Sequence, residues 1–312
     1  MKSNDISIVH AASNYLNGLS AVEASRKIGI KSVYEVRGLW EVTRISRQAD
    51  WGNTDLYKFM GRMETEACNN ADAVITITKA LKDLMVSRGV AEEKITVVPN
   101  CVDTGKFEPF LPRDESLAKK IGIKNDDVVI GYIGSIVNYE GLDDLFYAIS
   151  IMKDKGIKKF KMLLVGDGEY FDHLIKLSKS LSIESYVIFT GRIPHAEVKK
   201  YYSLVDIAPF PRKPFLVCEI VSPLKPFEAM ASGKAVLVSS CDALTEIVDN
   251  RKNGIVFDKG NIDDLADKLQ MLIENKNLRI KLGEQASVWV RKHRDWKVSA
   301  NLISNIYKGL LG

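Results

Sequence analysis

The chain has 312 residues, of which 46% are hydrophobic and 27% are charged, and its formal net charge is +4. These values are typical of an ordinary soluble protein that is long enough for two domains, and so small a charge gives no reason to expect nucleic acid as a partner. The four cysteines form no CxxC pair and the four histidines lack metal-ligand spacing, so neither a disulfide framework nor a metal site is predicted.

No apolar run is long enough to span a bilayer, and the first residues, Met1–Asp5, do not form a signal-peptide core. We therefore expect a cytoplasmic protein.

Short β-rich runs alternate with amphipathic helical stretches along nearly the whole chain. The predicted strands cover residues 6–10, 33–36, 73–78, 95–99, 128–133, 161–165, 187–190, 207–209, 235–239 and 255–257. The clearest predicted helices cover residues 142–154, 170–181, 197–204, 262–274 and 278–292. Continuous apolar strands between amphipathic helices indicate an α/β protein whose parallel sheets are covered on both faces.

The stretch 100–113 contains Pro109 and Pro112 and is typical of a linker. Because the strand–helix pattern restarts after it, we place a domain boundary there, with a first domain at residues 1–108 and a second at residues 109–294.

Open α/β sheets bind ligands at the carboxyl ends of their strands, so the loops after the strands of the second domain are candidate site segments. Glycines and basic residues follow four of these strands: Gly134, Gly166, Gly168, Arg192, Arg212 and Lys213. A glycine after a strand is commonly only part of a turn, and each loop alone is weak evidence. Their coincidence on one predicted edge favours a ligand site there.

The segment 222–236 carries two charges that helix formation does not require. Ser222 is a good N-cap, Pro223 suits the first helical position, and Gly233 supplies a C-terminal stop. Lys225 lies in the first turn, where the helix dipole disfavours a cation unless an anion such as phosphate binds there. Glu228, one turn later, is suited to accept hydrogen bonds from a ribose diol. The segment therefore predicts a nucleotide site.

Several motifs, in chain order, carry a resemblance to a known family. They are VVPNCVD at 97–103, YIGS at 132–135, LVGDG at 164–168, FEAMASGK at 227–234, and TEIV at 245–248 followed by NG at 253–254. Together they resemble the retaining glycosyltransferases of family 4, which have the GT-B architecture of two facing, doubly wound Rossmann-like domains. The segments YEVRGLWE at 34–41 and YEGL at 139–142 resemble one branch of that family.

The resemblance implies an enzyme that moves a hexose from a nucleotide sugar to a glycan, a lipid-linked molecule or a small molecule. The donor, of UDP or GDP type, is bound by the second domain, with no metal ion and no further cofactor. The final segment, residues 295–312, is expected to cross back and pack on the first domain.

The resemblance also implies roles for residues at matching positions. Lys225 is expected near the diphosphate, where it has a catalytic role, and Glu228 is expected on the ribose. The other expected donor-binding residues are Gly134, Ser135, Gly166, Gly168, Arg192, Thr245 and Glu246. Arg37, after the predicted strand 33–36, is the best candidate for chemistry from the first domain. The alternative for Arg37 is a structural ion pair with Glu35 or Glu41.

Three departures from the family pattern bear on function. Many members have an Arg and a Lys where this chain has Ser135 and Glu140, so Lys225, together with Arg192, Arg212 or Lys213, is expected to bind phosphate. A glutamate that contacts the sugar is expected where this chain has Ile220, and Glu219 lies one residue away. Only about a hundred residues precede the linker, so we expect the first domain to lack its N-terminal part.

Two other functions were considered beside sugar transfer. A catalytically incomplete nucleotide-sugar-binding subunit would need the missing N-terminal segment or a partner chain. An NAD-dependent oxidoreductase is disfavoured, because Gly166-Asp167-Gly168 lacks the third glycine and the acidic ribose partner of a dinucleotide site.

The stretch 40–62 mixes aromatic and basic side chains, including Trp40, Phe59, Arg44 and Arg47. Aromatic residues beside cations suit a lipid-linked acceptor or peripheral contact with the inner face of a membrane. The alternative is an ordinary segment with one buried face and one solvated face.

Overall fold

The computed structural model describes residues 6–312, so expectations about Met1–Asp5 lie outside the described residues. The chain divides into two compact units. The first unit contains the chain up to Asn100 together with Phe215–Ser222 and Trp296–Gly312, and the second contains Cys101–Pro214 and Pro223–Asp295. The chain therefore passes between the units at residues 100–101, 214–215, 222–223 and 295–296.

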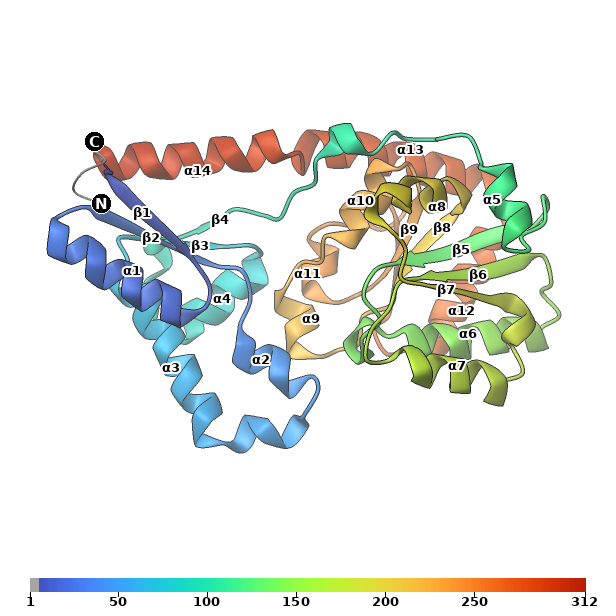
Figure 1. Cartoon of the computed structure of the whole chain (residues 1–312), viewed down its shortest axis with the longest axis horizontal. Coiled ribbons are helices and arrows are strands. Elements are labelled where there is room, and N and C mark those ends of the chain that lie inside the picture. The colour runs from blue at the N-terminus through green and yellow to red at the C-terminus, as the bar shows by residue number, and fades with distance from the viewer. Residues whose placement is uncertain (1–5) are drawn as a thin grey trace. The chain divides into compact units, whose positions relative to one another are not determined.

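The first unit is built on a parallel sheet with the order β1-β2-β3-β4 (Figure 1). Its strands are β1 (Ile8–Ala12), β2 (Lys31–Val36), β3 (Ala73–Thr76) and β4 (Ile95–Val97). Its helices are α1 (Tyr15–Ile28), α2 (Trp40–Ile45), α3 (Asp55–Asn70), α4 (Lys79–Ser87), α9 (Leu216–Ile220) and α14 (Trp296–Leu311). The first strand begins two residues later than predicted, because pairing of Ile8 with Lys31 sets its start.

The C-terminal helix α14 covers one face of this sheet, and α1 and α3 lie against the other (Figure 1). Val33, Ile75 and Val98 are buried beneath the apolar stripe of α14, which consists of Leu302, Ile303, Ile306, Tyr307 and Leu310. Burying an aliphatic side chain of this size stabilises a fold by about 1.5–3 kcal/mol. The helical spacing of apolar residues near the C-terminus therefore serves packing within the first unit.

The second unit contains a six-stranded parallel sheet with the order β10-β9-β8-β5-β6-β7. Its strands are β5 (Val128–Ile133), β6 (Phe160–Val165), β7 (Val187–Gly191), β8 (Ile207–Phe210), β9 (Ala235–Ser239) and β10 (Ile255–Phe257). Its helices are α5 (Glu115–Lys120), α6 (Leu142–Asp154), α7 (Phe171–Ser180), α8 (Val198–Leu204), α10 (Lys225–Ala231), α11 (Asp242–Thr245), α12 (Ile262–Glu274) and α13 (Lys276–His293). The predicted α/β class with two parallel sheets is confirmed.

This strand order creates a topological switch point between β5 and β8. The chain runs outward from β5 through β6 and β7, then returns to β8 and continues in the opposite direction through β9 and β10. At such a point the loops leave neighbouring strands in opposite directions and open a crevice at the carboxyl ends. The segments after β5 and β8 are therefore the natural place for a ligand.

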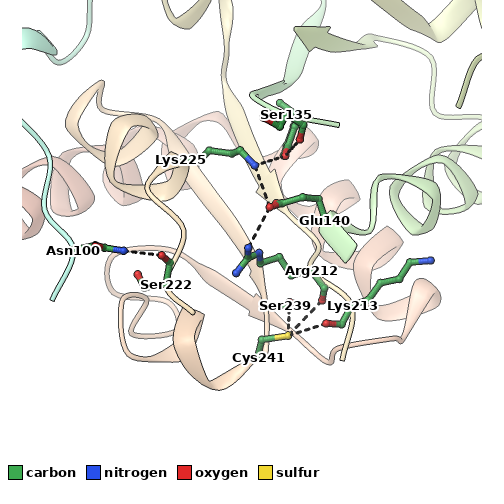
Figure 2. Close-up of polar contacts among 10 residues, drawn as sticks. Asn100, Ser135, Glu140, Arg212, Lys213, Ser222, Lys225, Ser239 and Cys241 are labelled. Carbon is green, nitrogen blue, oxygen red and sulfur yellow. Dashed lines mark hydrogen bonds and ion pairs between the residues drawn. The ribbon is translucent and has the colours of Figure 1, made fainter. Parts of the chain in front are cut away.

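The helix expected after Ser222 starts later than the sequence suggested. Helix α10 begins at Lys225, its N-cap is Leu224, and no side chain caps it. Ser222 instead lies where the chain passes between the units, and its main-chain carbonyl accepts a hydrogen bond of 2.9 Å from the Asn100 side chain (Figure 2). The predicted stop is confirmed, since Gly233 has a φ of 72° just after the helix.

Among residues 6–312, no helix combines the length and the apolar character needed to cross a bilayer.

Candidate functional site

The loops after β5, β6 and β7 enclose a pocket of about 420 Å³ at the carboxyl edge of the larger sheet. It is lined by Gly134, Ser135, Gly166, Asp167, Gly168 and Arg192. A volume of this size lies in the range of small-molecule sites, which is about 300–1,000 Å³. The structure thus brings five residues that the sequence marked for donor binding into one pocket. Asp167 joins them from the middle of the GDG sequence.

Two glycines allow these loops to pack backbone against backbone. A Cβ atom at Gly166, whose φ is 136°, would overlap the carbonyl of Gly134, and one at Gly168 would overlap the carbonyl of Ile136. Any larger residue would push the β5 and β6 loops apart and disrupt the wall of the pocket.

Lys225 is bound to the loop after β5, although it does not line the pocket. Its Nζ lies 2.7 Å from the Tyr132 hydroxyl and 3.0 Å from Glu140 Oε1, and its stem packs against Gly134. The Tyr132 hydroxyl in turn donates a hydrogen bond of 2.9 Å to the carbonyl of Ser135. Figure 2 shows Lys225, at the start of α10, close to Glu140 and to Ser135 of the pocket loop.

Arg212 and Lys213 follow β8, but each is paired with a carboxylate of the same unit. Arg212 Nη2 lies 3.2 Å from Glu140 Oε1, and Lys213 Nζ lies 2.6 Å from Asp143 Oδ2. The thiol of Cys241 lies 3.5 Å from the carbonyls of Arg212 and Lys213 and helps to hold this loop (Figure 2). Of the three cations proposed to assist Lys225, only Arg192 lines the pocket.

Glu140 is buried, and its charge is set by its neighbours. Burial alone would raise the pKa of this carboxyl, but Arg212 and Lys225 together hold the pKa below its ordinary value. Burial lowers the pKa of Lys225, whereas Glu140 opposes that shift. The result is a compact ion cluster beside the pocket.

Glu228 lies one turn after Lys225 on α10 and is half-buried. Its Oε2 accepts a hydrogen bond of 3.3 Å from the Tyr202 hydroxyl, and burial raises the pKa of its carboxyl. Thr245 and Glu246 lie at the end of α11, which follows β9. None of these three residues lines the pocket.

Arg37 belongs to the first unit and is about half exposed. Its Nε lies 3.5 Å from Glu35 Oε1, and its main-chain N–H donates a hydrogen bond of 2.8 Å to Ser13 Oγ. The alternative partner, Glu41, is buried and binds Arg88 at 2.8 Å. The structural pairing weighed for Arg37 is therefore present, with Glu35.

No role in the site was predicted for Tyr132 or Glu140, although both lie in segments that carry the family resemblance. For Tyr132, the available signal was a tyrosine at the end of a buried strand, two residues before Gly134. Within residues 6–312, no cluster of three or more His, Cys, Asp or Glu side chains could hold a metal ion.

Comparison with known proteins follows the same division of the chain. Residues 113–289 match the family described as Glycosyl transferases group 1, and residues 1–106 match Glycosyltransferase Family 4. The chain belongs to the glycosyl transferases group 1 family.

Two curated relatives show the extent of the likeness. An uncharacterized glycosyltransferase of Methanocaldococcus jannaschii is 26% identical over 260 residues, which cover 82% of this chain and 64% of the relative. The D-inositol 3-phosphate glycosyltransferase of Corynebacterium jeikeium is 27% identical over 257 residues, which cover 79% of this chain and 59% of that relative. The chain thus spans 59–64% of the length of these relatives.

Among solved structures, the Anabaena protein HepE in complex with UDP superposes with a TM-score of 0.83 at 17% identity. The match covers 99% of this chain and 80% of that one. At this identity the likeness concerns the fold, and it confirms the GT-B architecture that the motifs implied.

Proposed function

We propose that this chain acts in the transfer of a sugar from a UDP- or GDP-linked donor to an acceptor, with retention of anomeric configuration. The observation that carries the proposal is the pocket beside the β5–β8 switch point, where predicted donor-binding residues meet and a lysine is bound to the same loop. Family membership and the UDP complex of HepE support the same chemistry.

In this proposal the second unit binds the donor and stabilises the leaving diphosphate. Arg192 and Lys225 supply positive charge where negative charge develops as the glycosidic bond breaks. Glu228 accepts hydrogen bonds from the ribose, and Thr245 and Glu246 complete the donor side. Arg37 is the candidate for chemistry that the first unit contributes. No step requires a covalent bond to the protein or a metal ion.

Calorimetry with UDP and GDP tests the donor site. We expect binding of at least one nucleotide diphosphate, and we expect Glu228→Ala to weaken it by about 1–3 kcal/mol, because the ribose hydroxyls lose their acceptor. Glu184→Ala, at an exposed glutamate of the same unit, is the matched control and should leave affinity unchanged.

If neither nucleotide binds the wild-type chain, the proposal is wrong. Binding without sugar transfer to any acceptor offered would favour the alternative of a nucleotide-sugar-binding subunit.

We also propose that the acceptor is a glycan or lipid-linked molecule approached at a peripheral membrane contact of the first unit. Trp40 is 58% exposed and Phe59 is 42% exposed. Around Trp40, a pocket of about 550 Å³ is lined by Thr43, Arg44, Arg47, Gln48, Trp51 and Met60. Glu41, an acidic residue of the same stretch, is buried and pairs with Arg88.

Sedimentation with vesicles rich in anionic lipid tests this contact. Trp40→Ala should lower the bound fraction several-fold, because an aromatic ring at the lipid interface contributes apolar area. Val288→Ala, at an exposed apolar residue of the second unit, should not change it. Equal binding of wild type and Trp40→Ala would show that this surface does not contact lipid.

A further inference from the structure

One oxygen of Glu140 is shared by two cations that come from different segments. Oε1 lies 3.0 Å from Lys225 Nζ and 3.2 Å from Arg212 Nη2. Glu140 ends the short turn before α6, Arg212 follows β8, and Lys225 begins α10. Figure 2 shows the three side chains in a row, with the carboxylate in the middle.

The burial of this cluster makes the carboxylate indispensable to the two cations. The Glu140 side chain is 3% exposed, that of Arg212 is 5% exposed and that of Lys225 is 19% exposed. Buried cations this close repel each other strongly, because the surrounding dielectric is low. Lys225 is the one that can escape the repulsion by losing its proton, since a guanidinium stays charged in proteins.

The polar and charged groups that face Lys225 come from four segments of the chain. Glu140 precedes α6, the Tyr132 hydroxyl comes from β5, Arg212 follows β8, and Glu228 lies one turn along α10. Burial and Arg212 lower the pKa of Lys225, while Glu140 is the strongest influence that raises it, with a smaller contribution from Glu228. Removing Glu140 therefore lowers that pKa further.

A continuous chain of hydrogen bonds joins this cluster to the pocket. Lys225 donates to Tyr132, and Tyr132 donates to the carbonyl of Ser135, which lines the pocket. The direction of the ammonium group is thus fixed from one side by Glu140 and from the other by the loop that forms the pocket wall.

We propose that Glu140 is a positioning residue for donor binding: it keeps Lys225 charged and aimed at the Gly134–Ser135 loop. This inference rests on the function proposed above. Glu140 is not expected to touch the donor, because it acts through Lys225. Its second role is to offset part of the repulsion between the two neighbouring positive charges of Lys225 and Arg212.

The pH dependence of nucleotide diphosphate binding tests this role in the full chain. Affinity for UDP or GDP, whichever binds the wild-type protein, is measured by calorimetry between about pH 6 and pH 10. In Glu140→Gln, affinity should be lost on the alkaline side at a pH at least about one unit lower than in the wild type, because the amide no longer stabilises the ammonium group. A merely structural role would lower stability without changing the pH at which affinity is lost.

The double variant Glu140→Gln with Lys225→Arg tests whether Lys225 causes the loss of affinity at alkaline pH. Because arginine does not lose its proton in this range, the alkaline loss of affinity should disappear. If it persists, or if Glu140→Gln loses affinity at the same pH as the wild type, the inference is wrong.

A second variant keeps the inference testable if Glu140→Gln does not fold. Glu140→Asp retains the charge but is too short to reach both cations, and it should bind the nucleotide about three- to tenfold more weakly. Unchanged affinity of this variant would overturn the inference while leaving the proposed function intact. Failure of the wild-type protein to bind either nucleotide would overturn both.

Discussion

Two glutamates, one in each unit, are almost equally buried and yet have opposite pKa shifts. Glu64 on α3 is 1% exposed, and Glu140 near the pocket is 2% exposed. Burial raises the pKa of Glu64 to about 7, although the Tyr34 hydroxyl and the main-chain N–H of Tyr15 donate hydrogen bonds to it. Glu140, which is bound by two cations, has a pKa below its ordinary value.

The difference lies in the partners and not in the depth of burial. The donors to Glu64 are neutral at neutral pH, and Arg88, the cation that lowers its pKa, is already bound to Glu41 at 2.8 Å. The negative charge of Glu41 raises the pKa of Glu64 further. A buried carboxylate is therefore kept ionised by adjacent cations, and of these two glutamates it is Glu140 that binds two of them. This is why Glu140 can act as a counterion beside the candidate donor site.

Removing one cation from the Glu140 cluster should destabilise the fold clearly. Arg212→Met should lower the free energy of unfolding by about 1.5 to 3 kcal/mol, because buried Glu140 loses one of its two charged partners and keeps only Lys225. Urea denaturation followed by circular dichroism measures it.

Arg37→Met is the matched control for this substitution. Arg37 also pairs with a glutamate, but its side chain is 55% exposed. Pairs of that kind contribute about 0–1 kcal/mol, so its stability should stay close to that of the wild type. A loss of less than about 1 kcal/mol for Arg212→Met would show that the Glu140 cluster behaves like a surface pair.

The pH dependence of stability should reveal Glu64 in the other unit. Its folded-state pKa of about 7 lies above the ordinary value of 4.5. The proton is therefore held more tightly in the folded chain, and the stabilisation is complete below about pH 4.5 and lost as the pH rises through about 7. This change amounts to roughly 3 kcal/mol, and Glu64→Gln should abolish it.

Urea denaturation at a series of pH values compares the stability of the wild type with that of Glu64→Gln. Glu66→Gln, at an exposed glutamate on the same helix, is the control and should retain the wild-type dependence. If the stability of Glu64→Gln still falls over this range, the change belongs to another group and the contrast with Glu140 is not due to partner charge.

Local pattern was enough to predict much of the fold. Strand β5, strand β9 and helix α6 have the predicted limits, because their apolar spacing decides which residues face the core. The start of α10 was predicted wrongly. Ser222 and Pro223 have the composition of a helix start, but Ser222 contacts Asn100 where the chain passes between the units, and the helix begins only at Lys225.

The candidate site was predicted in part for a similar reason. Gly134, Gly166 and Gly168 follow adjacent strands, so the rule about carboxyl ends of parallel strands was sufficient to gather them. The partner of Lys225 could not be predicted in this way. Glu140 is 85 positions earlier in the chain, and nothing in the sequence connects it with Lys225.

By itself the sequence determined the α/β class, the order of strands and helices, the family resemblance and the edge of the sheet where a ligand would bind. These follow from periodicity and from glycines that local backbone geometry requires. Tertiary structure alone decided which charges meet: Arg212 turned inward to Glu140, Lys225 joined them beside Tyr132, and Glu64 was left among neutral donors. Electrostatic energy depends on distance and burial in space, and neither quantity is encoded by spacing along the chain.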